Sequence, residues 1–161
     1  MGLLRIHRIA SPGGELRTGE GLPVARRAYV ARTALSRLVG MLGTPDPARD
    51  EALVLTPCSA VHGVGLRAGI GVAFVDRAGI VLRVVDPLPW RGASCPGAHA
   101  VIEAARGVLA VSPGDRLVLT PELVFPHGGH FASTAGGSNP VPGALSDHRG
   151  HPAPACDRRT P

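Results

Sequence analysis

Two short apolar runs with a turn between them constrain the fold of this chain more than any other sequence feature. Residues 70–75 and 80–85 both alternate in the way that strands do when they bury one face. Between them lies Asp76-Arg77-Ala78-Gly79, in which the glycine can supply the positive φ of a tight turn. The pattern predicts an antiparallel β-hairpin.

One helix and several further strands complete the prediction. Thr33 is a suitable N-cap, Gly43 a suitable stop, and the apolar residues between them recur at helical spacing, which predicts a helix near residues 34–42. The stripe on this helix consists of Leu35, Leu38, Val39 and Leu42. The predicted extended runs are 3–6, 22–30, 52–55, 99–105 and 116–120, with turns at 11–14 and 112–115. The expected fold is α+β and mostly β: a small curved antiparallel sheet or partial barrel, with this one main helix packed on it.

The composition divides the chain into two parts. Residues 1–125 are of the usual size for one hydrophobic core, and we expect a single β-rich globular domain there. Residues 126–161 hold six prolines and six glycines in 36 positions and few large apolar side chains. Such a segment cannot bury enough surface to offset the entropy of ordering, so it is predicted to be a disordered tail rich in proline and glycine that also contains histidines.

Charge and targeting signals exclude several classes of protein. The 17 basic residues are all arginine and give a formal net charge of +5, but they are scattered rather than gathered into a stripe, so nucleic-acid binding is only a weak alternative. No run approaches the roughly 20 apolar residues of a membrane span, and residues 1–8 hold no apolar leader. We therefore expect a cytoplasmic protein with no membrane partner, whose cysteines 58, 95 and 156 are free thiols.

The order of the motifs resembles an uncharacterised family, the domain of unknown function 192. The resemblance covers residues 22–120, and two positions depart from the family pattern: Gly71 stands where an aspartate is usual, and Leu66 where a methionine is usual. It implies a small β-rich fold and no established activity. The matching pieces are Ala31-x-Thr33-x-x-x-Arg37-x-x-Gly40-Met41, Pro57-Cys58, Val61-His62, the strand 70–76, Ile102-Glu103 with Gly107, and Gly114-Asp115.

The pair Cys58-x-x-x-His62 is the first candidate ligand-binding site, because thiol and imidazole serve both metal binding and nucleophilic catalysis. Residues four apart lie about 6 Å from each other on a helix but about 13 Å on a strand. Pro57, Gly63 and Gly65 disfavour a helix here. We therefore favour a buried thiol and a hydrogen-bonded histidine over a joint site.

Glu103, Arg37 and Cys95 are the remaining candidates for ligand binding. Glu103 alternates with apolar neighbours; if it is buried, it must pair with an arginine such as Arg37 or Arg83, or its pKa must rise. A structural ion pair is favoured over a general base. Cys95 could join the pair if its loop folds over the same face.

No complete catalytic motif is present: the sequence lacks H-E-x-x-H, C-x-x-C and G-x-S-x-G. No catalytic residue, metal or cofactor is therefore assigned, and the expected function is that of a noncatalytic binding or accessory domain. The alternative is a small metal- or thiol-dependent enzyme that uses Cys58 and His62. The sequence identifies neither a ligand, a partner nor an oligomeric state.

Overall fold

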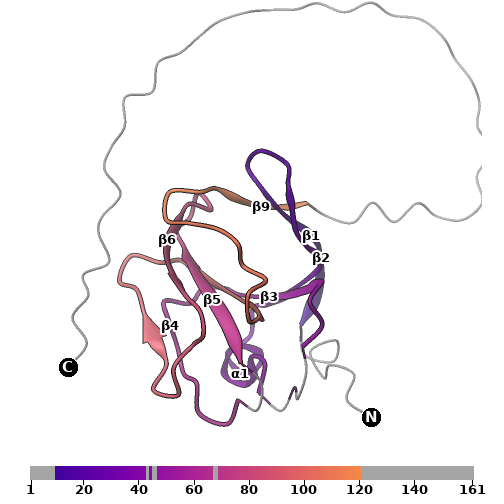
Figure 1. The fold of residues 1–161 in the computed structure, drawn as a ribbon. Coiled ribbons are helices and arrows are strands. Elements are labelled where there is room, and N and C mark those ends of the chain that lie inside the picture. The colour runs from indigo at the N-terminus through magenta and orange to yellow at the C-terminus, as the bar shows by residue number, and fades with distance from the viewer. Residues whose placement is uncertain (1–9, 43, 45–46, 67–68, 121–161) are drawn as a thin grey trace, which may run out of the picture.

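Seven strands form one curled sheet in the computed structural model of the protein, in the order β6-β5-β8-β3-β2-β1-β9 (Figure 1). Two short strands, β4 and β7, pair separately. In chain order the elements are β1 (Ser11–Thr18), β2 (Pro23–Ala31), α1 (Ala34–Val39), β3 (Glu51–Leu55), β4 (Ala60–Val61), β5 (Ile70–Val75), β6 (Val81–Val85), β7 (Ala93–Ser94), β8 (Ala100–Ala105) and β9 (Leu117–Thr120).

The structure describes residues 10–42, 44, 47–66 and 69–120. The strand predicted at 3–6 and the tail predicted at 126–161 lie outside these residues, so both stay predictions. Within the described ranges no helix is long and apolar enough to cross a bilayer.

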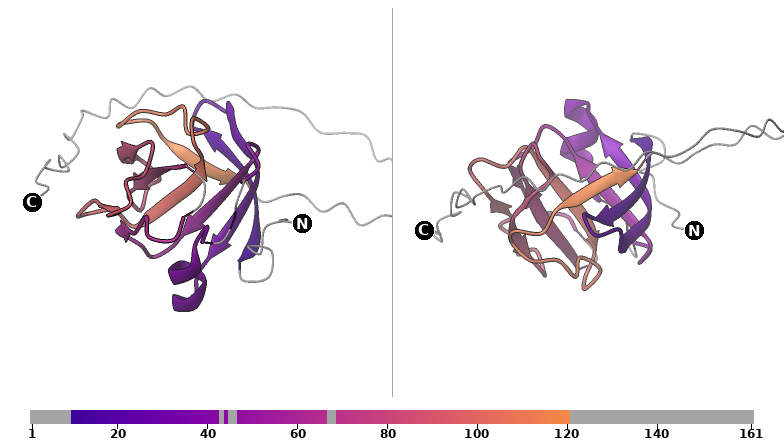
Figure 2. Two further views of the ribbon diagram at one scale, coloured as in Figure 1. Left: turned by 60° about the horizontal axis from the view of Figure 1, so that its bottom comes forward. Right: turned by 90° about the horizontal axis from the view of Figure 1, so that it is seen from above.

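The sheet is mostly antiparallel and curls into a half-barrel, which confirms the expected fold class (Figure 2). The one parallel pair of the sheet joins β2 to β3, with α1 in the connection between them. Parallel neighbours need such a crossover connection, whereas antiparallel neighbours can be joined by a tight turn. The helix α1 is therefore part of the crossover connection between β2 and β3.

The centre of the sheet is buried on both faces. Every residue of β5 and β8 is buried, and alternate residues belong to two separate apolar clusters. Ile70, Val72, Phe74 and Val101 pack in one cluster, together with Met41 after the helix. Because side chains alternate along a strand, Glu103 lies on the same face of β8 as Val101. That face is the one covered by the helix.

The predicted hairpin and its turn are confirmed. The Asp76 N–H donates to the Ile80 carbonyl at 3.0 Å, and Gly79 has a φ of 82°. The same turn meets the far edge of the sheet, because the Leu117 N–H donates to the Gly79 carbonyl at 2.8 Å and Ile80 bridges Arg116. Val81 of β6 extends this contact, because its N–H donates to the Asp115 carbonyl and its carbonyl accepts from the Gly114 N–H, both at 2.8 Å. The two edges of the curl are therefore joined along residues 79–81 and 114–117.

The predicted turn at 11–14 is wrong, because these residues begin β1. The pairing of β1 with β2 shifts register after Pro12, Gly14 and Leu16, and these irregularities accommodate the proline and glycines. Pairing with β9 starts only at Glu15, so the missing N–H of Pro12 disrupts no ladder on that side.

The predicted apolar stripe of the helix is also wrong. Leu35 and Leu38 are 66% and 63% exposed, whereas Ser36 is buried. Thr33 and Ser36 form a capping box, with the Ser36 N–H donating to the Thr33 Oγ1 at 3.1 Å. This box turns Ser36 inward, and Gly40 ends the helix after six residues, so Met41 makes the apolar contact with the sheet.

We expect Gly79→Ala to destabilise the protein more than Gly114→Ala, by at least about 1 kcal/mol. Both glycines have positive φ, which costs an alanine about 1–2 kcal/mol. Only at Gly79 would a Cβ also collide with a backbone oxygen, that of Leu117, whereas Gly114 faces open space. Urea unfolding of both variants measures the difference, and equal losses would show that the close approach of the Leu117 carbonyl to Gly79 tolerates a Cβ.

Candidate functional site

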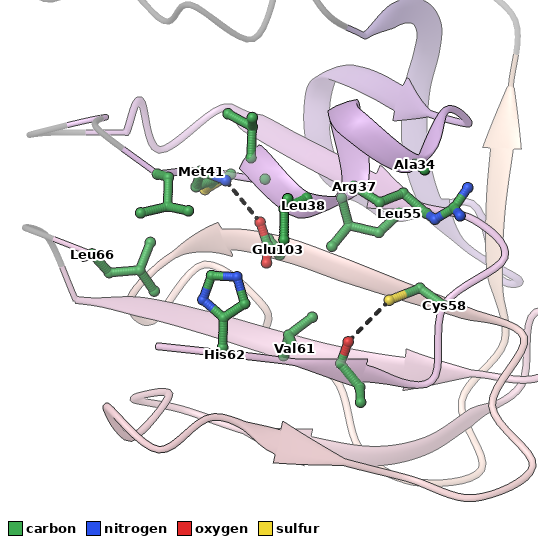
Figure 3. Close-up of a pocket in the computed structure, with 14 residues that line it drawn as sticks. Ala34, Arg37, Leu38, Met41, Leu55, Cys58, Val61, His62, Leu66 and Glu103 are labelled. Carbon is green, nitrogen blue, oxygen red and sulfur yellow. Dashed lines mark hydrogen bonds between the residues drawn. The ribbon is translucent and has the colours of Figure 1, made fainter. Parts of the chain in front are cut away.

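A cavity of about 280 Å³ lies between α1, the residues that follow it, and the segment 58–66 (Figure 3). Its walls are largely apolar, and its polar groups come from Arg37, Cys58, His62 and Glu103. Four of the five predicted site residues therefore line one pocket. The apolar lining side chains are those of Ala34, Leu38, Val39, Met41, Leu42, Leu55, Ala60, Val61 and Leu66.

Glu103 is the most deeply buried polar group of this pocket. It stands on β8 opposite Leu53 of β3 and Val72 of β5, and only 4% of its surface is exposed. The Met41 N–H, just beyond the helix, donates to its Oε2 at 3.1 Å. Glycine at position 40 permits this approach for two reasons. A Cβ there would lie only 3.1 Å from the same oxygen, and the backbone has a φ of 48°, which other residues rarely adopt.

The described part of the chain gives the Glu103 carboxylate no ion pair. The two arginines that the sequence offered point elsewhere: Arg37 Nη1 donates to the Arg32 carbonyl at 2.6 Å, and Arg83 Nη1 to the Ser94 carbonyl at 2.8 Å. Burial therefore raises the pKa of Glu103 to about 7, and the Met41 hydrogen bond acts in the opposite direction. The ion pair that the sequence analysis favoured for Glu103 is not formed among the described residues. The other expectation, that the pKa of a buried Glu103 rises, holds instead.

The second carboxyl oxygen of Glu103 faces the pocket. Among the described residues Oε1 has no hydrogen-bond partner, and Figure 3 shows it on the side of the His62 ring. Within the described part of the chain Glu51 Oε2 is fully buried without a partner, but Glu103 Oε1 is not, so Oε1 is open to the pocket. A water or a ligand in the pocket can therefore supply the donor that this oxygen lacks.

Cys58 and His62 line the same pocket but do not form a pair. The expectation of a buried thiol and a hydrogen-bonded histidine is wrong, because Cys58 is only half-buried and His62 is exposed, with no hydrogen bond to the described residues. The Cys58 thiol donates to the Ala60 carbonyl at 3.1 Å, and Figure 3 shows Val61 between the sulfur and the imidazole. Burial raises the pKa of the Cys58 thiol, so the thiolate needed by a nucleophile is disfavoured. In the described ranges no three His, Cys, Asp or Glu side chains gather as metal ligands.

Cys95 lies in the core and not in the pocket lining. It is fully buried, although its N–H donates to the Ser59 carbonyl at 2.9 Å and so holds its backbone beside the segment that carries Cys58. It is also disulfide-bonded, whereas Cys58 is free. The expectation of free thiols is wrong at Cys95, because the spacing of cysteines along a chain does not determine which of them approach each other.

The space beside Gly71 is filled by Asp86. A Cβ at Gly71 would lie 2.7 Å from Asp86 Oδ2, which accepts a hydrogen bond from the Gly107 N–H at 2.7 Å. A carboxylate thus occupies this place although the strand itself carries none. No sequence signal indicated this role of Asp86 or that of the Met41 N–H, although Gly40-Met41 belongs to a recognisable motif.

Replacement of Glu103 by glutamine should remove a pH dependence of stability. The folded state holds the proton of Glu103 more tightly than the unfolded state, because its pKa is raised from 4.5 to about 7. The free energy of unfolding of the unaltered protein should therefore fall, relative to Glu103→Gln, as the pH rises from 4.5 to about 7. Linkage puts the full difference on the order of 3 kcal/mol.

Urea unfolding of both proteins between pH 4 and pH 8 measures this difference. Glutamine keeps an acceptor for the Met41 N–H, so the comparison isolates the charge. Parallel stability curves for the two proteins would contradict a buried titrating carboxyl group.

Comparisons with known proteins show the family and the fold. No curated protein matches the sequence. A crystal structure of a protein of unknown function from Novosphingobium aromaticivorans DSM 12444 is similar, with a TM-score of 0.57 and 17% identity over 73% of this chain and 99% of that one. A candidate transcription regulator from Sinorhizobium meliloti 1021 has a TM-score of 0.57 and 18% identity over 65% of this chain and 90% of that one.

These two likenesses show a shared fold alone. The sequence profile of one family, DUF192, described as "Uncharacterized ACR", matches residues 16–119. Because this match spans more than half of the chain and agrees with the motifs that carried the resemblance, the protein belongs to the DUF192 family.

Proposed function

We propose that this DUF192 domain is a noncatalytic binding module that holds a small organic molecule in the pocket between α1 and residues 58–66. One observation carries the proposal: Glu103 is buried, yet its Oε1 faces a cavity and has no partner among the described residues. Because this oxygen is open to the cavity, a molecule bound there can donate a hydrogen bond to it.

The composition of the pocket supports a ligand with an apolar body. Ligand sites are mostly apolar, with a small number of polar groups that fix orientation, and volumes begin at roughly 300 Å³. The cavity of about 280 Å³ lies at this lower end, so it suits a small molecule. Glu103 at its floor and Arg37, Cys58 and His62 around it are the groups that would orient such a molecule.

The noncatalytic part of the proposal rests on the state of Cys58. A catalytic thiol is paired with a base that takes its proton. Here the thiol donates to a backbone carbonyl, and its burial favours the neutral form. The arrangement therefore gives the thiol-dependent alternative no activated nucleophile.

Three small molecules of one branched shape test the binding proposal: isobutanol, isobutylamine and isovalerate. We expect at least one to shift the Met41 amide resonance in ¹H–¹⁵N spectra at millimolar concentration, because this N–H contacts Glu103 at the pocket floor. Shifts by none of the three would contradict the proposal.

A pair of helix variants provides the control. Ala34 lines the pocket, and tryptophan there should block it and weaken binding by about tenfold or more. Its neighbour Leu35 is exposed and does not line the pocket, so Leu35→Trp should leave the dissociation constant within about twofold. Equal effects would show that the probes bind elsewhere on the helix.

The cytoplasmic location stays a prediction, and the state of Cys95 tests it. Cytosolic thiols are kept reduced, whereas the disulfide-bonded form of Cys95 belongs to an oxidising compartment. In a cytoplasmic protein we expect Cys95 to be alkylated by iodoacetamide when cells are acid-quenched and the protein is then denatured at mildly basic pH without reductant, which exposes the buried sulfur. Mass spectrometry reads the result, and protection of Cys95 under these conditions would contradict the cytoplasmic location.

A further inference from the structure

Two buried carboxylates on the described strands differ in their electrostatic surroundings. Glu51 of β3 is 3% exposed, and Arg27 Nη2 lies 3.1 Å from its Oε1. Glu103 is equally buried, but the described residues supply only the neutral Met41 N–H to it. A buried carboxylate without a cation is costly. Among the described residues Glu51 has Arg27 beside one oxygen, although its Oε2 is buried without a partner, whereas Glu103 has no cation and its Oε1 is open to the pocket.

The positive charge nearest to this pocket stands at its other end. Arg37 points to the Arg32 carbonyl, and Figure 3 shows its guanidinium on the Cys58 side, with Leu38 and Leu55 between it and Glu103. The pocket thus has a carboxyl group at one end and a guanidinium at the other, with apolar walls between them. A bound group beside Glu103 is separated from the arginine by these walls.

We propose that the ligand of this pocket is a small organic cation, a primary ammonium or amidinium on a short apolar body, whose charged end binds Glu103. This proposal rests on the proposed function, since it names the chemical class of the molecule that the pocket holds. The cationic end donates to Oε1 and supplies the charge that the fold omits, and the apolar body packs against Leu38, Leu55 and Val61.

The other ionisable groups around Glu103 do not replace such a ligand. From α1 there is Arg37, from the segment 58–62 there are Cys58 and His62, and on the same face of β3 there is Glu51, which is paired with Arg27. None of these forms a hydrogen bond or ion pair with Glu103 within the described ranges. Of the ionisable groups around the pocket, Glu103 is therefore the one whose ionised form a bound cation would stabilise most.

The test compares three probes that share one isobutyl body on the full chain at pH 7. Isobutylamine is the cation, isobutanol the neutral analogue and isovalerate the anion, and the Met41 amide resonance follows each titration. We expect isobutylamine to bind at least about tenfold more tightly than isobutanol, as charge-assisted hydrogen bonds exceed neutral ones by such a factor. Isovalerate should bind most weakly of the three.

Two variants identify the group responsible. Glu103→Gln should lose this preference for the amine while still binding isobutanol, which also shows that the pocket is intact. Glu15→Gln, which also removes one carboxylate but lies on β1 outside the pocket, should keep the preference within about twofold. An unchanged preference in Glu103→Gln would overturn the proposal.

A pH series adds a second readout. Between pH 6 and pH 8 the ionised fraction of Glu103 rises from about a tenth to about nine tenths, whereas an alkylamine stays protonated. The affinity for isobutylamine should rise severalfold over this range, and that for isobutanol should not. Affinity for the amine that is flat or falls with pH would contradict binding at Glu103.

The failures of the two proposals are distinguishable. If none of the three probes binds, the small-molecule pocket itself is wrong. If isobutanol or isovalerate binds as tightly as isobutylamine, the pocket stands and the cationic ligand is overturned.

Discussion

The hydrogen bond between the Met41 N–H and Glu103 joins the two parts of this fold that the site depends on. Glu103 belongs to β8, a central strand buried on both faces, and Met41 follows the short helix carried by the β2–β3 connection. The bond therefore fixes the end of the helix over the sheet and at the same time holds a carboxyl group away from water. Because one oxygen is used in this way and the other is not, a structural contact also creates a binding group.

Features that depend on neighbouring residues could be predicted from the sequence. The turn at 76–79, the turn at 112–115 and the Thr33 cap follow from local backbone preferences, and the structure confirms each of them. Alternation also placed Glu103 on the face of its apolar neighbours, and the structure shows that this face is buried. In each case the relevant interaction is decided within a few residues of the chain.

Features that depend on contacts between distant segments could not be predicted. Alternation placed Glu103 on the covered face but could not say that Met41, and no arginine, would meet it. The helical stripe was misjudged because a capping box and an early stop at Gly40 turned the helix the other way. The strand spacing of Cys58 and His62 argued against a joint site, and it could not show that a loop and a short strand would still place both on one pocket.

The pairing of β1 with β9 has a consequence for how this protein is made. The first and last strands of the described sheet are neighbours, and β9 also contacts the Gly79 turn at the opposite edge. A ribosome delivers the chain from its N-terminus, so β1 must wait with one edge unpaired until residues near 120 have emerged. Closure of the sheet by β9 delays its completion until these residues are available, and until then the nascent chain carries an open edge, which can pair with other chains.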